Sequence, residues 1–304
     1  MSSPTSIGRI IRQRAGLAFP MLTPPERKKF YTTCLADAVL VGNFKSRRDL
    51  IFQLRRDGAS QAHAWNTVCD MLRMNTTRFF RHSRQIREFA DRIASENSPY
   101  RSGKRLEIWS AGCSTGEEAI TLALVLAGLN RRQPVDYRIL GSDLSGLALA
   151  QASLFIFRSS QVRREVPREY LRFFKPGVPR GQCFVHLDEE VSRRISWARH
   201  NLIKDPIPRK KFDVIFFRNV LVHLDTDPAS IVLSRLAESA RPGGLLFVSR
   251  ADVSYIKDRV PPEWEWVSST TLVRCSKAQS NAGPIQSQCW RLDKKEQRMG
   301  NTKA

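Results

Sequence analysis

The stretch EIWSAGCSTGEE, residues 107–118, decides the fold of this chain. It overlaps a short apolar strand pattern, LEIWSAG at 106–112, and runs into a helical pattern, GEEAITLALVLAGLN at 116–130. The turn between them carries Gly112 and Gly116, and glycine allows a tight turn and a close approach of the backbone to a ligand. This order predicts the first unit of a doubly wound α/β sheet, with a ligand bound where the strand ends.

The glycine spacing and the neighbouring charges narrow the class of ligand. Gly-x-x-x-Gly departs from the dinucleotide pattern G-x-G-x-x-G and lacks the Gly-Lys-Ser/Thr ending of a phosphate loop. Glu117 and Glu118 follow at once, and their charges would repel a pyrophosphate. S-adenosylmethionine carries a sulfonium and an ammonium and no phosphate, so its charge suits this acidic turn. The alternative is that the two carboxylates only stabilise a helix N-terminus.

After the glycine turn, strand patterns alternate with helical patterns. The strand patterns are YRILGSDLS at 137–145, FDVIFFRNVLV at 212–222 and GGLLFVS at 243–249, and one of the helical patterns is ASIVLSRLAESA at 229–240. Such alternation predicts a mostly parallel, doubly wound sheet. The second strand ends at Asp143, where an acidic side chain accepts hydrogen bonds from ribose hydroxyls in nucleoside-binding folds. The alternative role of Asp143 is to cap the next helix.

Composition and periodicity divide the chain into four parts. Residues 1–29 contain Pro, Arg and Ser with weak periodicity, which predicts a flexible basic arm, and residues 30–98 predict an N-terminal helical domain. Residues 99–276 are expected to form the ligand-binding α/β domain. Within it, residues 173–198 combine turn residues with two alternating runs, which predicts an inserted antiparallel hairpin forming a small β-subdomain. Residues 277–304 are polar and aperiodic and predict a disordered tail.

The overall charge predicts an acidic partner. The 304 residues contain 50 Lys and Arg against 29 Asp and Glu, a formal net charge of +21. Such a chain is attracted to nucleic acid, an anionic membrane surface or an acidic protein. Residues 1–105 hold 20 Lys and Arg against 8 Asp and Glu, so more than half of the excess lies there.

Targeting and metal-binding signals are absent from the sequence. No apolar run approaches the roughly 18 residues of a membrane span, and the N-terminus lacks a signal-peptide pattern. The six cysteines are scattered, without the spacing of a metal site. We therefore expect a cytoplasmic protein with reduced cysteines, which binds no metal and is not an integral membrane protein.

Four blocks of the sequence resemble the chemotaxis methyltransferases of the CheR family. They are MNTTRFFRHSRQIREF at 74–89, EIWSAGCSTGEEAITLAL at 107–124, HNLI at 200–203 and FDVIFFRNVLVHLD at 212–225. Their conjunction, over about residues 70–275, is far more specific than any single block. The resemblance implies a class I methyltransferase with a Rossmann-like doubly wound sheet, an N-terminal helical domain and S-adenosylmethionine as cofactor.

The resemblance also implies a reaction and a partner. The methyl group would pass to glutamate side-chain carboxylates in the acidic cytoplasmic region of a methyl-accepting chemoreceptor or a related signalling protein, forming glutamate methyl esters. The hairpin at 173–198 corresponds to the β-subdomain with which some members of the family dock onto a receptor tail peptide. The basic N-terminal helices resemble the element that approaches the acidic receptor.

Individual residues receive roles from the same resemblance. Asn75, Thr77 and Arg81 would reach from the helical domain over the cofactor. Glu118 and Asp143 would hold its amino-acid end and its ribose, in an order that the sequence leaves open. The other expected cofactor-binding residues lie in the turns after strands and are Gly112, Asn201, Leu202, Asn219 and Val220.

Methyl transfer to a glutamate needs alignment and not a general base, because the carboxylate is already ionised at pH 7. Its oxygen must come within about 3–3.5 Å of the methyl carbon. Arg81 is the candidate seat for the carboxylate, since a planar guanidinium suits it; the alternative is an arginine with a structural role. His223 stands where the family has a tyrosine beside the methyl group, so it is the second candidate catalytic residue. Its charge is expected to change near pH 6.5.

The sequence leaves two other functions open. A nucleic-acid methyltransferase would use the basic surface to displace counterions from phosphate, but the chain has no Asn/Asp-Pro-Pro-Tyr/Phe motif and no Pro-Cys pair. The second is a catalytically weak or silent relative that binds the cofactor as a regulator or scaffold. His223 favours this interpretation, and so does SRAD at 249–252, where the family has a Gly-His-x-Glu-like segment.

Overall fold

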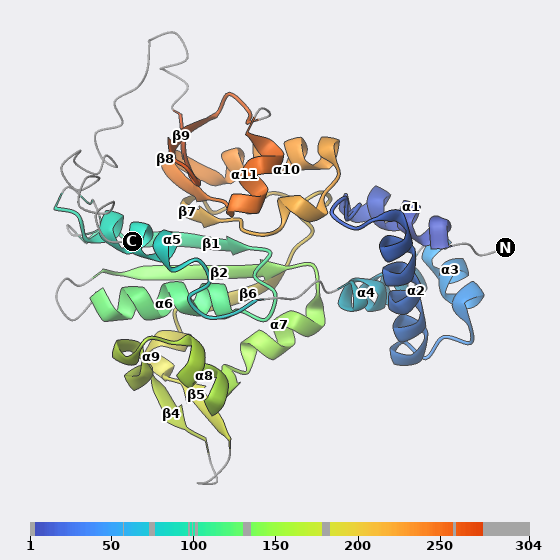
Figure 1. The fold of residues 1–304 in the computed structure, drawn as a ribbon, viewed down its shortest axis with the longest axis horizontal. Helices are drawn as coiled ribbons and strands as arrows, with labels where there is room; N and C mark the ends of the chain where they lie inside the picture. Colours follow the sequence, from blue (N-terminus) through green and yellow to red (C-terminus); the bar gives the residue numbers. More distant parts are fainter. Residues whose placement is uncertain are drawn as a thin grey trace.

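The computed structural model describes residues 4–56, 58–72, 77–96, 98, 100, 103–129, 135–177, 183–257 and 260–275. Asn75 and the predicted tail at 277–304 lie outside these residues. Figure 1 shows a helical domain at the N-terminal end, a central sheet with helices packed against it and a small β-subdomain next to α6 and α7.

A seven-stranded sheet forms the centre of the molecule, with the strand order β6-β2-β1-β7-β8-β10-β9 (Figure 1). Its parallel strands are β6 (Ile195–Arg199), β2 (Tyr137–Asp143), β1 (Leu106–Ala111), β7 (Phe212–Phe216) and β8 (Ala240–Phe247). The strand order reverses beside β1, and doubly wound sheets bind ligands outside the carboxyl ends of the strands at such a point. The predicted doubly wound α/β fold is confirmed.

An antiparallel hairpin that the sequence analysis did not predict completes the sheet. It consists of β9 (Trp264–Ser268) and β10 (Thr271–Arg274), and β10 pairs with β8. The two strands are short, and no helix lies between them. Periodicity alone therefore gave no reason to place them in the same sheet.

Helices pack on both faces of the sheet, because successive side chains of a strand point to opposite faces. Ile108 and Phe216 belong to the core beneath α5 and α6, whereas their neighbours Trp109 and Ile215 belong to the core beneath α10 and α11. The helices of the α/β part are α5 (Ser83–Ala94), α6 (Glu117–Leu129), α7 (Gly146–Ser153), α10 (Thr226–Ser239) and α11 (Arg250–Ile256).

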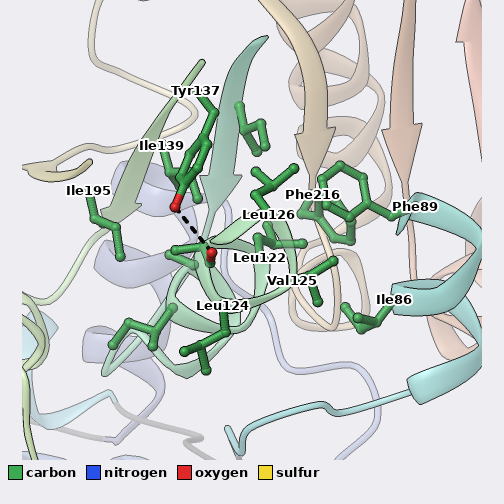
Figure 2. Close-up of a cluster of buried hydrophobic side chains, with 14 of the residues drawn as sticks. Ile86, Phe89, Leu122, Leu124, Val125, Leu126, Tyr137, Ile139, Ile195 and Phe216 are labelled. Atoms are coloured by element: carbon green, nitrogen blue, oxygen red, sulfur yellow. Dashed lines mark hydrogen bonds between the residues drawn. The ribbon is translucent and has the colours of Figure 1, made fainter. Parts of the chain in front are cut away.

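The core between α5, α6 and the sheet is shown in Figure 2. Phe89 of α5 is fully buried, and its ring lies edge-on to those of Phe216 and Phe247, with centroid distances of 5.4 and 6.3 Å. The Tyr137 hydroxyl donates a hydrogen bond to the carbonyl of Ala123 at 3.2 Å, so this buried polar group is satisfied. These contacts fix α5, and with it the segment that precedes it, against the sheet.

The N-terminal helical domain contains α1 (Pro4–Ala15), α2 (Pro24–Val41), α3 (Arg47–Arg55) and α4 (Ala59–Met71). It corrects the predicted arm at 1–29. Ile7 and Ile11 are 1% and 0% exposed and, with Ala15, form one buried face of α1. An apolar residue at every fourth position is a helix signal; the sequence analysis overlooked it because arginines separate these residues.

The inserted β-subdomain is present, but its boundaries differ from the prediction. Its antiparallel sheet has the order β3-β5-β4 and consists of β3 (Ile156–Arg158), β4 (Phe174–Pro176) and β5 (Phe184–Leu187). It therefore starts before the predicted hairpin at 173–198. The second alternating run, at 193–197, belongs to β6 and pairs in parallel with β2 of the central sheet. Alternation identifies a strand but not its partner, which only the tertiary structure decides.

Truncation of Phe89 tests the core of Figure 2. Phe89→Ala should lower the free energy of unfolding by about 3–5 kcal/mol, the usual cost of removing a buried aromatic side chain. Phe52 of α3 is 60% exposed, and Phe52→Ala should change the same quantity by only about 0.5 kcal/mol. Chemical denaturation followed by circular dichroism measures both, and equal costs for the two variants would contradict this packing.

Candidate active site

A cavity of about 570 Å³ lies at the carboxyl ends of the parallel strands. This volume falls in the range of small-molecule sites, roughly 300–1,000 Å³. Every described residue that the sequence analysis proposed for the site lines it: Thr77, Arg81, Gly112, Glu118, Asp143, Asn201, Leu202, Asn219, Val220 and His223. The remaining candidate, Asn75, lies outside the described residues.

The glycine turn after β1 has a backbone conformation that other residues rarely adopt. Gly112 and Gly116 have φ angles of +77° and +93°. A Cβ on Gly112 would lie 2.5 Å from Val220 Cγ2, and one on Gly116 would lie 2.7 Å from the Trp197 ring. Both positions therefore require glycine, for backbone conformation and for space.

The carboxylate of Asp143 is held at the end of β2 by two backbone amides. Ser114 N donates to one oxygen at 2.8 Å and Ser145 N to the other at 2.9 Å. Burial raises the pKa of Asp143, and these hydrogen bonds oppose the shift. The N-cap of α7 is Ser145, whose hydroxyl accepts from Ala148 N. The alternative of Asp143 as the helix cap is therefore wrong, and the residue lines the cavity with its carboxylate held in a fixed orientation.

A residue of the helical domain supports this arrangement. Asp70 at the end of α4 accepts hydrogen bonds at Oδ1 from Ser145 Oγ at 2.8 Å and from Leu147 N at 3.0 Å. The same Ser145 donates its amide to Asp143. Asp70 thus fixes the turn between β2 and α7 from outside the α/β domain. The sequence analysis missed it, because nothing in the local sequence marks a contact over this separation.

The two neighbouring glutamates of α6 have different surroundings. Glu118 lines the cavity; it accepts from Ser110 Oγ at 2.7 Å, and its other oxygen lies 3.5 Å from Arg218 Nη1. Burial raises the pKa of Glu118, and Arg218 opposes the shift. Glu117 accepts from Thr115 Oγ1 at 2.7 Å and does not line the cavity. Only Glu118 is in position to contact a ligand.

Arg218, at the end of β7, is a central residue of the site that the sequence analysis did not single out. Its side chain is 2% exposed, and its Nη2 donates to the carbonyl of Arg81 at 2.5 Å. The Phe80 amide donates to Thr121 Oγ1 of α6 at 3.0 Å. These bonds hold the segment before α5 over the cavity. The signal was present, since Arg218 lies within the FFRN run of a quoted block.

Arg81 combines partial burial with a position on the cavity wall. Burial lowers its pKa, and so does the neighbouring Arg78, while Glu118 and Asp252 oppose the shift. The guanidinium stays charged at neutral pH, because an ordinary arginine titrates above pH 12. A fixed positive charge therefore lies on the wall of a cavity that is also lined by the carboxylates of Glu118 and Asp143.

The segment that departs from the family pattern, at 249–252, has a structural role. Asp252 is fully buried and accepts hydrogen bonds from Asn219 N at 2.6 Å and Val222 N at 3.3 Å. Asn219 has a φ of +59°, a conformation that asparagine tolerates. Ser249 and Asp252 also form the capping box of α11. The aspartate thus positions the loop of Asn219 and Val220 at the cavity.

His223 lies in a short 3-10 helix, Leu221–His223, against the N-terminal segment. Its carbonyl accepts from Ala18 N at 2.9 Å and Phe19 N at 3.1 Å, and its ring lies 5.7 Å from the Phe19 ring. Its Nδ1 is buried and has no hydrogen bond within the described residues. Burial lowers the pKa of His223, and Arg81 adds to the shift. The charge change expected near pH 6.5 is therefore moved to lower pH.

Asn201 uses its side chain to hold the structure around the cavity. Its Nδ2 donates to the carbonyl of Arg14 at 2.9 Å, and its Oδ1 accepts from Ile203 N at 3.0 Å. The first bond connects the loop after β6 to the end of α1. Asn201 therefore lines the cavity with Leu202 but has its amide engaged by the protein.

The described parts of the chain hold no candidate metal site and no candidate membrane span. No group of three or more His, Cys, Asp or Glu side chains there has an arrangement that could hold a metal ion. No described helix reaches the length and hydropathy of a membrane span.

Comparison with known proteins identifies the family of this chain. Residues 75–261, more than half of the chain, match the family described as CheR methyltransferase, SAM binding domain. A chemotaxis protein methyltransferase of Escherichia coli (strain K12) is 27% identical over 249 residues, which cover 81% of this chain and 82% of that protein. A probable chemotaxis protein methyltransferase of Rhizobium etli is 31% identical over 193 residues, which cover 63% of this chain and 72% of that protein.

Among solved structures, magnesium protoporphyrin IX methyltransferase of Synechocystis PCC 6803 with bound S-adenosylmethionine is 15% identical and gives a TM-score of 0.34. The alignment covers 78% of this chain and 97% of that chain. The score is too low to support an argument about function. The family match, together with the doubly wound sheet and its cavity, establishes that the chain belongs to the CheR methyltransferase family and binds S-adenosylmethionine as its cofactor.

Proposed function

We propose that this protein transfers the methyl group of S-adenosylmethionine to glutamate side-chain carboxylates of a chemoreceptor-like protein, forming glutamate methyl esters. The observation that carries the proposal is that one cavity is lined both by the carboxylates of Glu118 and Asp143 and by the guanidinium of Arg81. The relatives are named chemotaxis protein methyltransferases, which supports the same class of substrate.

The residues of the cavity suit this cofactor. The backbone at Gly112 approaches Val220 so closely that a side chain would fill the space. The carboxylates of Glu118 and Asp143 match a ligand with two positive charges and no phosphate. The volume of about 570 Å³ leaves room for a nucleoside with an amino-acid chain.

We assign the ribose to Asp143 and the ammonium to Glu118. Asp143 ends β2, the position of the ribose-binding acid in doubly wound nucleoside-binding folds, and amides of Ser114 and Ser145 orient its oxygens. Glu118 lies in the first turn of α6, with Arg218 Nη1 3.5 Å from its carboxylate and Arg81 also near enough to act on its pKa. A bound ammonium would add a further positive charge beside this buried carboxylate.

The acceptor glutamate would enter beside Arg81 and His223. When bound, S-adenosylmethionine supplies a methyl group on a cationic sulfur that becomes a neutral thioether. The acceptor oxygen is already ionised, so no side chain has to take a proton. Arg81 would hold the carboxylate in line, and neutral His223 would add no positive charge next to the sulfonium.

The product and the role of Arg81 are tested together. With tritiated cofactor and the cytoplasmic fragment of a chemoreceptor, we expect label on the protein that mild base releases as methanol. Arg81→Ala should lower kcat/KM about 100-fold or more, as loss of one oriented donor does, whereas Arg87→Ala, at an exposed position of the following helix α5, should not. Base-stable label, or label on RNA, would contradict the proposal, and cofactor binding without transfer to any receptor fragment would favour the silent regulator.

The roles assigned to Asp143, which binds the ribose, and Asp70, which supports Ser145, predict losses of cofactor affinity of different size. Asp143→Ala should raise the Kd about 10- to 100-fold, because it removes charge-assisted hydrogen bonds. Asp70→Ala should raise it about 5-fold, because the turn of Ser145 loses its support. Asp49→Ala is the control, since Asp49 makes similar hydrogen bonds within the helical domain, to Lys45 N and Gln53. Calorimetry measures all three; an Asp143→Ala variant with unchanged Kd would refute the ribose role.

The lowered pKa of His223 predicts the pH dependence of cofactor binding. At pH 7 the imidazole is neutral, and its protonation at lower pH would add a positive charge beside Arg81 and the sulfonium. We expect the affinity of the wild type to stay constant down to about pH 6.5 and to fall below it. His223→Tyr should remove part of that fall, because tyrosine titrates near pH 10. An inflection above pH 6.5 that this variant abolishes would contradict the burial of the ring.

A further inference from the structure

More arginines surround the mouth of the cavity than one acceptor carboxylate needs. Arg78 and Arg81 line the cavity from the segment before α5, and Ala251 lines it from α11. Arg250 directly precedes Ala251, and the side chains of Arg78 and Arg250 are exposed. Arg250 also belongs to the segment that departs from the family pattern.

Buried hydrogen bonds hold the two arginine-bearing segments side by side. Gln85 Nε2 of α5 donates to the carbonyl of Val248, at the end of β8, at 2.7 Å. Arg218 Nη2 donates to the carbonyl of Arg81 at 2.5 Å. The start of α5 is thereby fastened to the start of α11, which brings Arg78 and Arg250 to the same side of the cavity.

The pKa of His82 reflects the arginines that surround it. Burial and then the repulsion of Arg218, Arg81, Arg78 and Arg250 lower its pKa to about 4. Burial contributes most to this shift, and the four arginines add to it, so the electrostatic field at His82 is positive. His82 itself stays neutral at pH 7 and adds no charge to the group.

The two carboxylates near these arginines, Glu118 and Asp252, already have other hydrogen-bond or ion-pair partners. Glu118 accepts from Ser110 and pairs with Arg218, and Asp252 accepts from Ser249 and Asn219. Within the described residues, neither the Arg78 nor the Arg250 guanidinium makes a hydrogen bond or an ion pair with a carboxylate. Two exposed guanidinium groups at a ligand entrance are therefore available for an anionic group of the substrate.

We propose that Arg78 and Arg250 form a second carboxylate-binding subsite, which holds another acidic side chain of the segment whose glutamate is methylated at Arg81. The subsite rests on the proposed function and adds a rule of selection to it. An acceptor glutamate with a second carboxylate about one helical turn away is preferred over an isolated one, because residues three or four apart lie on the same face of a helix.

An acidic protein segment fits this surface better than a nucleic acid does. Guanidinium groups pair with carboxylates and with phosphates alike through two parallel hydrogen bonds, so the surrounding aromatic residues decide between the two classes of partner. A platform for single-stranded nucleic acid would interleave its basic residues with exposed aromatic rings on which bases stack. The aromatic residues beside Arg78 instead pack inward, since Phe79 is 2% exposed and Phe80 stacks on Tyr170.

The test measures the affinity of two peptides for each of three proteins. One fluorescent, alanine-based helical peptide carries an acceptor glutamate and a second glutamate one turn later; its twin has glutamine at the second position. The proteins are the wild type, Arg78→Gln with Arg250→Gln, and a control of equal charge, Arg163→Gln with Arg209→Gln. Arg163 lies on α8 (Ser159–Glu165) of the β-subdomain. Arg209 precedes the amino end of β7, whereas the cavity lies at the carboxyl ends of the strands.

In the wild type and in the control, the two-glutamate peptide should bind about 10-fold more tightly than its twin, the value of one charge-assisted contact. The Arg78/Arg250 variant should bind both peptides alike, with thermal melting unchanged. A preference that survives in this variant, or that the control loses equally, would overturn the subsite. Displacement of the peptide by an RNA oligonucleotide that binds more tightly through the same two arginines would also overturn it.

The methyl-ester assay stays separate from these affinity measurements. If the receptor fragment is not methylated but the peptide preference depends on Arg78 and Arg250, the proposed reaction fails and the carboxylate subsite stands. If methyl esters form and the preference is absent, the subsite fails and the proposed reaction stands. The peptide measurement needs no turnover, so each result has its own meaning.

Discussion

The buried guanidinium of Arg218 is the interaction on which the site depends. It lies between Glu118, at 3.5 Å, and the carbonyl of Arg81, at 2.5 Å. A buried charge without partners would cost several kcal/mol, so the cofactor half of the site and the acceptor half are stable only together. Arg218 also favours the ionised form of Glu118 in the cavity, because it opposes the rise in the pKa of Glu118 that burial causes.

The helical domain is a wall of the cavity and not an attachment to it. Leu17 pairs with Leu224, Asn201 donates to the carbonyl of Arg14, and Asp70 holds Ser145. Each bond joins a loop at the carboxyl end of a strand to a residue more than sixty positions away. Any movement of the helical domain is thus coupled to the loops that surround the cofactor.

The sequence alone determined the class of fold and most of the site. Gly112, Gly116 and Asp143 lie where a doubly wound sheet places its ligand turns, and local patterns of two and 3.6 residues identified the strands and helices around them. The charge of the glycine turn indicated a cationic ligand without phosphate. These conclusions needed only neighbours in the chain, and a resemblance over four blocks gave the candidate residues.

Only the tertiary structure decided which of these side chains face the cavity and what holds them. It separated Glu118 from Glu117, gave α1 a buried face, moved the run at 193–197 into the central sheet and brought Arg250 to the entrance. It also identified Arg218, Asp252 and Asp70 as supports. Their partners are distant in sequence, and a hydrogen bond or a desolvated charge is fixed by proximity in space, which local periodicity does not encode.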